Sequence, residues 1–230
     1  MNQNNDDSGA VVLLSGGLDS SVLLAHTAKT LEEGPIHGLS FSYGQRHVKE
    51  LACARWQAEW AGIARHHVIP MDFLGPLLSS GTALVEGGDA VPDLETLSDE
   101  ERSQPPTYVP NRNMLLLSLA AAYAEAEGMS KVYYGAQAQD EYGYWDCTHA
   151  FLERINALLK LNRKTPVQIQ APFMDKSKAE IVTTGLELKV NFAQTWSCYR
   201  GGEKPCGECP TCVERRHAFE GNGMTDPLEQ

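Results

Sequence analysis

Basic side chains are scarce in this chain of 230 residues, in which 19 Lys and Arg face 30 Asp and Glu for a net charge of −11. Nucleic-acid affinity comes largely from Lys and Arg that neutralise phosphates, so this balance favours a small-molecule substrate over nucleic acid. The sequence has no run of about eighteen apolar residues, which argues against a membrane span. Residues 1–9 are polar and lack the apolar core of a secretory signal, so we expect a cytoplasmic protein.

The two common phosphate-binding signatures, G-x-x-x-x-G-K-[ST] and G-x-G-x-x-G, are also missing. Residues 11–25 nevertheless read VVLLSGGLDSSVLLA, an aliphatic strand followed by a glycine turn and a helix. The amides of such a turn and the positive end of the helix dipole favour an anion. Asp19 is unexpected in an anion site, and it either holds Mg²⁺ beside phosphates or caps a helix that begins at Ser20. A plain strand-to-helix turn is the structural alternative.

Apolar strands alternate with helical patterns along most of the chain. Strands are expected at residues 10–15, 36–44, 65–71, 131–136 and 167–173, and helices at 20–31, 47–61, 111–126, 149–161 and 177–188. This alternation predicts an α/β, Rossmann-like, doubly wound fold with a mainly parallel five-stranded sheet. In the second helix, Val48, Ala52, Trp56 and Trp60 recur every four positions and predict its buried stripe. Residues 79–107 interrupt the rhythm and predict a loop or lid.

Cysteine is sparse, but four of the six cysteines lie within fifteen residues. Their spacing is C-x7-C-x2-C-x2-C, formed by Cys198, Cys206, Cys209 and Cys212. Four thiolates can enclose one structural Zn²⁺ per chain without an open coordination position, although an iron–sulfur cluster or redox thiols stay possible. We therefore expect three parts: a disordered N-terminus (1–9), a nucleotide-binding α/β domain (10–195) and a small zinc-binding C-terminal segment (196–230).

The S-G-G-x-D-S turn after a hydrophobic strand resembles the PP-loop of the adenine nucleotide alpha-hydrolase-like superfamily. That resemblance implies ATP as a co-substrate, used with Mg²⁺, with its pyrophosphate held by the loop and attack at the α-phosphorus. The residues that it implies for ATP binding are Leu14, Ser15, Gly16, Gly17, Leu18, Asp19, Ser20 and Ser21. The missing Walker lysine agrees with this interpretation, because that lysine tracks the β- and γ-phosphates during γ-phosphoryl transfer.

Further stretches resemble the 7-cyano-7-deazaguanine synthases of the queuosine pathway. They are LSFSYGQRHVKEL (39–51), TYVPNRNMLLLSLAAAYAE (107–125), DEYGYWDC (140–147) and TWSCYRGGEKPCGECPTC (195–212). The resemblance implies an ATP-dependent carbon–nitrogen ligase that converts 7-carboxy-7-deazaguanine and ammonia into the nitrile, through an adenylated carboxylate and then an amide. It also implies a homodimer. The alternatives are another PP-loop enzyme, such as a tRNA thiolase, and a nucleotide-binding module without catalysis.

The candidate catalytic residues are Asp19, Arg46 and Arg112. Arg46 follows the second strand, at the sheet edge where open α/β folds bind ligands. Arg112 begins a helix, where a cation is unfavourable unless an anion lies nearby. A carboxylate of Asp140 or Asp146 can accept N–H groups from a guanine-like edge. The full set of candidate substrate residues is Tyr43, Gln45, Asn113, Asp140, Tyr144 and Asp146.

This sequence departs from the family pattern at three positions. The family usually reads D-x-S-G-Y-P-D-C, whereas Tyr142 and Trp145 here replace a small polar residue and a proline. Asn111 stands where Gly is common, a mild change because Asn tolerates a left-handed backbone. Tyr144 or Trp145 is expected either to stack on a purine-like ring or to pack in the core. Cys147 lies beside the expected pocket without a clear partner that would make it a nucleophile.

Overall fold

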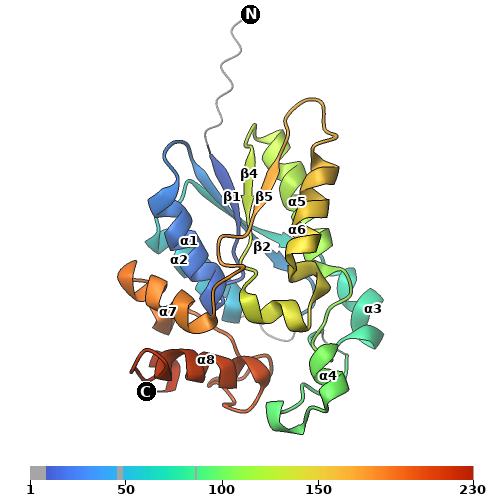
Figure 1. Ribbon diagram of the computed structural model, residues 1–230, viewed down its shortest axis with the longest axis vertical. Helices are drawn as coiled ribbons and strands as arrows, with labels where there is room; N and C mark the ends of the chain where they lie inside the picture. Colours follow the sequence, from blue (N-terminus) through green and yellow to red (C-terminus); the bar gives the residue numbers. More distant parts are fainter. Residues whose placement is uncertain (1–8, 46–48, 86, 230) are drawn as a thin grey trace, which may run out of the picture.

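The computed structural model describes residues 9–45, 49–85 and 87–229, which form a five-stranded parallel sheet in the order β3-β2-β1-β4-β5 (Figure 1). The strands are β1 (Ala10–Leu13), β2 (Ile36–Ser42), β3 (Arg65–Pro70), β4 (Lys131–Tyr133) and β5 (Gln168–Gln170). The apolar strand β1 lies at the centre because both of its faces are covered. Its Val12 pairs with Gly38 on one side and with Tyr133 on the other.

Helices cover both faces of the sheet, so the predicted doubly wound α/β fold is confirmed. The helices are α1 (Leu18–Thr30), α2 (Lys49–Trp60), α3 (Leu74–Leu78), α4 (Asp99–Ser103), α5 (Arg112–Ala126), α6 (His149–Leu159), α7 (Lys178–Glu187) and α8 (Pro210–Glu220). Helices α5 and α6 contribute to one buried cluster, and α1, α2, α7 and α8 contribute to the other. None of the helices in the described part is long and apolar enough to cross a membrane.

The predicted buried stripe of α2 is wrong. The buried face carries Leu51, Ala54 and Ala58, whereas Trp60 is 41% exposed and stacks on Trp56 at 6.3 Å between ring centroids. Alanine faces inward at position 54 because the backbone of α2 passes close to the glycine turn that follows β1, where a Cβ on Gly16 would lie 2.6 Å from the amide nitrogen of Ala54. Val48 lies outside the described residues.

The segment predicted as a loop or lid is anchored along its length. Its Val85 forms an antiparallel bridge with Gln45. Its Val91 packs in the hydrophobic cluster that contains the cysteines of the C-terminal segment, Cys198, Cys206, Cys209 and Cys212. Arg200 of the C-terminal segment donates hydrogen bonds to the carbonyl oxygen of Val91 at 3.1 and 3.3 Å and forms an ion pair with Asp93. The segment therefore forms a cover that is fastened to the cysteine-rich region.

Two local predictions at helix starts have different outcomes. Asn111 precedes α5 with φ of +55°, the left-handed conformation that was expected to be tolerable there. The expected Asp19 cap is wrong, because α1 begins at Leu18 and its N-cap is Gly17, which provides no side-chain cap. Asp19 instead lies in the first turn of the helix.

Candidate active site

A cavity of about 300 Å³ lies at the carboxyl ends of the central strands, the position at which open parallel sheets bind ligands. The cavity is lined by twelve of the residues predicted for ATP, substrate or catalysis: Leu14, Ser15, Gly17, Leu18, Asp19, Ser20, Tyr43, Gln45, Arg112, Asn113, Asp140 and Tyr144. Gly16, Ser21 and Asp146 are close in sequence but do not line it. Arg46 lies outside the described residues, and so do residues 1–8 of the expected disordered N-terminus.

The conformation of the glycine loop (residues 15–21) is fixed by its own side chains. The hydroxyl of Ser15 accepts the amide of Gly17 at 3.1 Å, and that of Ser20 accepts the amide of Gly16 at 3.2 Å. Gly16 has φ of +87°, and a Cβ there would lie 2.0 Å from the carbonyl oxygen of Glu50. Because Gly17 provides no cap, the first-turn amides of α1 keep their capacity to bind an anion.

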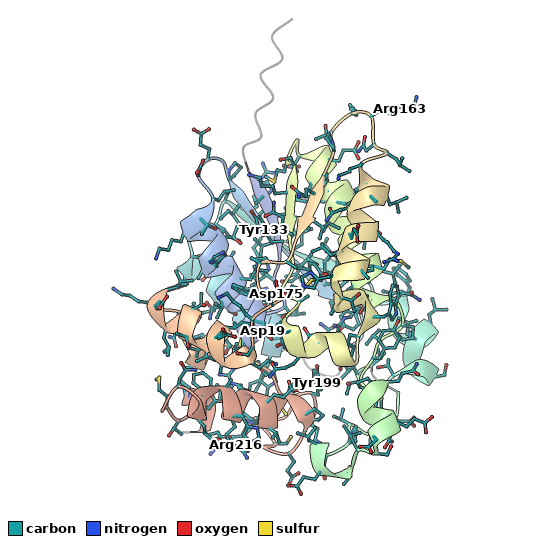
Figure 2. All side chains as sticks on the ribbon, in the orientation of Figure 1. Asp19, Tyr133, Arg163, Asp175, Tyr199 and Arg216 are labelled. Atoms are coloured by element: carbon teal, nitrogen blue, oxygen red, sulfur yellow. The ribbon has the colours of Figure 1, made fainter. Side chains whose placement is uncertain are left out.

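Asp19 contributes a carboxylate with one vacant acceptor. Its Oδ2 lies 3.7 Å from Nζ of Lys178, while its buried Oδ1 has no hydrogen-bond partner among the described residues. A buried carboxylate oxygen without a donor is costly, and a bound cation removes that cost. The first turn of α1 therefore combines backbone amides that suit an anion with a carboxylate oxygen that suits a cation, and Figure 2 labels Asp19 there.

Lys178 is the main site residue that the sequence reasoning missed. It opens helix α7, is 8% exposed, and its Nζ lies 3.1 Å from Oε2 of Glu214. Burial alone lowers the pKa of Lys178, but the carboxylates of Asp19, Glu214 and Asp140 outweigh it and raise that pKa above its usual value. A lysine in the first turn of a helix opposes the dipole, the signal that identified Arg112 and that also applies here.

Arg112 and Glu50 form a second pair of opposite charges in the cavity wall. Burial lowers the pKa of Arg112, but its hydrogen-bonded neighbour Tyr43 and the nearby Tyr199 raise it, so the guanidinium stays charged. Burial raises the pKa of Glu50 to about 7, opposed by Arg112. Glu50 is therefore a carboxyl group that titrates near neutral pH inside the cavity.

Asp140 and Asp146, which were predicted together, occupy different environments. Asp140 lines the cavity and accepts hydrogen bonds from the amide and the side chain of Gln137, each at 3.2 Å. Burial raises the pKa of Asp140 to about 6, opposed by Lys178. Asp146 is 2% exposed and accepts the amide of Asn113 at 3.1 Å, so its carboxylate fixes the start of α5.

Tyr144, Trp145 and Cys147 are close in sequence but also occupy different environments, because only the first and the last line the cavity. Tyr144 lines the cavity, whereas Trp145 is 48% exposed and its indole donates to the hydroxyl of Tyr108 at 2.7 Å. Cys147 lines the cavity and accepts a hydrogen bond from Asn113 at 3.1 Å. Burial raises the pKa of the Cys147 thiol, followed by Asp140 and Asp146, so this thiol is a poor nucleophile at neutral pH.

The four predicted cysteine ligands converge, with their sulfur atoms all within 4.8 Å of one another. Cys206 and Cys212 have Sγ atoms 3.9 Å apart. The backbone amides of Cys206 and Cys209 point at the sulfurs of Cys198 and Cys206, at 3.4 and 3.3 Å. Amide donors of this kind stabilise thiolates, so the four cysteines are arranged as the ligands of a metal ion would be.

The C-terminal segment also forms one wall of the cavity, which the sequence did not reveal. Its amide of Trp196 donates to the carbonyl oxygen of Gly16 at 3.0 Å, a direct contact with the glycine loop. Cavity-lining residues from this segment are Trp196, Ser197, Tyr199, Pro210, Thr211 and Glu214 (Figure 2 labels Tyr199). The metal site therefore supports a part of the candidate active site.

A doubly wound parallel sheet with an S-G-G-x-D-S anion loop, a vacant carboxylate oxygen and two cations defines an ATP-using enzyme of the PP-loop class. Residues 9–223 match the family model described as Queuosine biosynthesis protein QueC, and the chain belongs to this family. The resemblance predicted from the sequence is thereby confirmed.

Relatives and solved structures agree with this assignment. The chain is 43% identical over 221 residues to proteins named 7-cyano-7-deazaguanine synthase from Hahella chejuensis, covering 95% of this chain and 91% of that protein, and from Archaeoglobus fulgidus, covering 95% and 89%. The fold is similar to NMN synthetase from Francisella tularensis, with a TM-score of 0.52 and 14% identity over 95% of this chain and 78% of that one. The prediction of a synthase-type enzyme is confirmed, and the tRNA-thiolase alternative is not favoured.

Proposed function

We propose that the protein is an ATP-dependent ligase that converts 7-carboxy-7-deazaguanine and ammonia into 7-cyano-7-deazaguanine. The observation that carries the proposal is one cavity lined by groups that suit phosphates and by groups that suit a guanine-like ring. We assign the glycine loop, Lys178 and Arg112 to the phosphates (the phosphate end) and Tyr144 to the ring (the substrate end), with Asp140, which raises the pKa of Lys178, where the two meet. The shared name of the relatives supports the same reaction.

The phosphate end fits the pyrophosphate of ATP. The first-turn amides of α1 bind its oxygens, and Lys178 and Arg112 neutralise the charge that develops as pyrophosphate leaves. Asp19 would hold Mg²⁺ through Oδ1, which has no hydrogen-bond partner among the described residues, and the ion would supply charge neutralisation of the phosphates. Arg46, which follows β2, stays a predicted second clamp.

The chemistry is one activation carried out twice. The substrate carboxylate attacks the α-phosphorus, pyrophosphate leaves, and ammonia then displaces AMP to give the amide. The amide oxygen attacks the α-phosphorus of a second ATP in the same way. That oxygen then leaves as part of AMP, and the loss of two protons from the amide nitrogen gives the nitrile. Glu50 is suited to accept a proton during these steps, because its pKa of about 7 matches neutral pH.

The substrate end fits a flat, guanine-like ring. Tyr144 offers an aromatic face, and its hydroxyl is hydrogen-bonded to Oγ1 of Thr107 at 2.8 Å. Asp140 offers a carboxylate that can accept hydrogen bonds from ring N–H groups. Tyr43, Gln45 and Asn113 complete this wall as proposed contacts. Asp146 acts on the substrate through Asn113, whose amide it holds.

We assign one structural Zn²⁺ to the four cysteines. Four thiolates about 2.3 Å from a shared ion lie roughly 3.8 Å from one another, and together they leave no open coordination position. The Sγ separation of 3.9 Å between Cys206 and Cys212 supports this. Elemental analysis of the purified protein should find about one zinc per chain. Stoichiometric iron with visible absorbance would contradict the assignment and support the iron–sulfur alternative.

The remaining expectations belong to the same proposal. These are a homodimer, no binding of nucleic acid, a cytoplasmic location, and a boundary near residue 195 between the nucleotide-binding domain and the C-terminal segment. A cytoplasmic location suits a reduced thiolate site and an ATP-consuming reaction. Light scattering after gel filtration tests the dimer, and filter binding of tRNA tests the absence of nucleic-acid binding.

The decisive assay combines purified protein with ATP, ammonium and 7-carboxy-7-deazaguanine, and detects the nitrile by mass spectrometry. Asp19→Ala should abolish product while the protein stays folded. Asp175→Ala is the matched control, because that carboxylate is 87% exposed and only pairs with His149 at the surface. Absence of nitrile with the wild-type protein, or turnover that appears only on addition of tRNA, would refute the proposal.

A further inference from the structure

Tyr134 carries a buried hydroxyl that no described residue satisfies. The residue follows strand β4, its backbone amide donates to the carbonyl oxygen of Gln170 at 3.1 Å, and it is 4% exposed. Its hydroxyl oxygen has no hydrogen-bond partner in the described part of the chain. The same residue lines the cavity.

A buried hydroxyl without a partner is unfavourable, and phenylalanine would fill the same apolar space without that penalty. The ring of Tyr134 already packs in the cluster under α5 and α6. Packing therefore explains the ring but leaves the hydroxyl unexplained. A ligand that fills the adjacent cavity supplies the missing partner.

The strand that precedes Tyr134 determines the side from which its side chain reaches the cavity. Side chains alternate along a strand, so Val132 and Tyr134 face the α5 and α6 cluster while Tyr133 packs against the α1 and α7 cluster. Tyr134 thus faces the α5 and α6 side of the cavity, the side proposed above for the substrate ring, where Cys147, Asp146 and Asp140 are its electrostatic neighbours.

The hydroxyl stays protonated and is therefore available as a hydrogen-bond donor. Burial, Cys147, Asp146 and Asp140 together raise the pKa of Tyr134, so the phenol keeps its proton at neutral pH. Asp140 presents an acceptor in the same region. A donor beside an acceptor complements the guanine-like edge, on which a ring carbonyl oxygen lies beside N–H groups.

We propose that Tyr134 is a specificity-determining residue whose hydroxyl donates a hydrogen bond to the ring carbonyl oxygen of the substrate, next to the N–H groups that Asp140 accepts. This inference rests on the proposed function, because it assigns the deazaguanine ring to the substrate end. The proposal directs the reacting carboxylate at the glycine loop, away from this hydroxyl. A ring in which sulfur replaces the carbonyl oxygen keeps its N–H groups and offers the hydroxyl a weaker acceptor.

The test compares Tyr134→Phe with the wild type on two ligands, 7-carboxy-7-deazaguanine and the analogue in which sulfur replaces the ring carbonyl oxygen, so that the ring N–H groups are kept. Calorimetry in the presence of α,β-methylene ATP gives both dissociation constants. The substitution should weaken substrate binding about tenfold and change analogue binding less than twofold. In steady state the KM for the substrate should rise while kcat and the KM for ATP stay within about twofold.

Two further readouts separate recognition from structure. Tyr134→Phe should melt no lower than the wild type without ligand, because it removes only an unsatisfied group. Tyr133→Phe is the matched control, since it removes a neighbouring hydroxyl from a residue that does not line the cavity, and it should leave both affinities unchanged. Figure 2 labels Tyr133 on strand β4 and Asp19 at the glycine loop.

The outcomes also distinguish this inference from the proposed function. Unchanged substrate affinity in Tyr134→Phe, or an equal loss for both ligands, overturns the inference alone, because the hydroxyl would then not read the carbonyl. Failure of the wild-type protein to bind 7-carboxy-7-deazaguanine refutes the proposed function and this inference with it.

Discussion

Arg215 is the buried cation on which the attachment of helix α8 depends. Its guanidinium donates to both carboxylate oxygens of Asp226 at 2.7 and 2.9 Å, and the two side chains are 3% and 4% exposed. It also donates to Thr195 Oγ1 at 2.7 Å and to the carbonyl oxygen of Phe192 at 3.1 Å. The residues so fixed lead directly into the cavity wall.

Arg215→Ala should therefore be strongly destabilising. It leaves the Asp226 carboxylate buried without its counter-charge, which costs about 3–5 kcal/mol of unfolding free energy. For a chain of this size that corresponds to a fall in Tm of about 6–20 °C. Urea unfolding followed by circular dichroism measures the free energy, and a thermal melt measures Tm, both on protein of verified metal content.

The neighbouring arginine provides the control. Arg216 pairs with Glu229 at 2.9 Å, but these side chains are 36% and 31% exposed, and Arg216 also donates to the carbonyl oxygen of Gly207. Because solvent screens the pair, Arg216→Ala should cost at most about 2 kcal/mol. Equal losses of free energy in the two single variants would refute the reasoning.

A double variant tests the physical cause. Arg215→Met combined with Asp226→Leu removes both buried charges and keeps apolar volume, so it should recover most of the stability that Arg215→Ala loses. A double variant as unstable as Arg215→Ala would show that packing and the bonds to Thr195 and Phe192, rather than the stranded carboxylate, dominate the loss.

Three further substitutions test the cavity. Lys178→Met should lower kcat/KM for ATP about 10²–10³-fold, because it removes a charge that stabilises departing pyrophosphate. The control Lys29→Met, at an exposed position, should have no effect. Equal kinetics in the two variants would contradict this role of Lys178. Gly16→Ala should abolish ATP binding in calorimetry because its Cβ would lie 2.0 Å from a carbonyl oxygen of α2, whereas Gly62→Ala, with open space around it, should keep binding. Burial raises the pKa of Glu50 from 4.5 to about 7, so the folded state binds its proton more tightly and the wild type loses stability as pH rises between these values. Glu50→Gln should remove this loss in urea unfolding at pH 5 and 8, and an identical pH dependence in both proteins would refute it.

The parts of the fold that were predictable depend on local sequence. The strand before the glycine loop is a run of aliphatic residues, and it occupies the centre of the sheet, where both of its faces are covered. The glycine loop was recognisable because Gly16 needs a positive φ and close backbone approach, and both are present. The cysteine spacing likewise brings its own four sulfurs together.

The parts that were missed depend on contacts between distant segments. The buried side of α2 is set by the glycine loop beneath it, which admits alanine and excludes tryptophan. No property of the α2 sequence records that neighbour. The isolation of the Tyr134 hydroxyl is of the same kind, because the lack of a partner belongs to the whole fold. Lys178 is a different case, because a lysine at the start of a helix opposes the helix dipole and could have been recognised from the sequence.

The C-terminal segment links the metal site to nucleotide chemistry through two contacts. Trp196 donates to the glycine loop at Gly16, and Glu214 of α8 holds Lys178. Helix α8 begins beside Cys209 and includes Cys212, so a metal ion held by the four cysteines would also fix the helix that carries Glu214. Under the proposed function, the four cysteines thereby help to position Lys178, the cation assigned to the phosphates, because Glu214 pairs with that lysine.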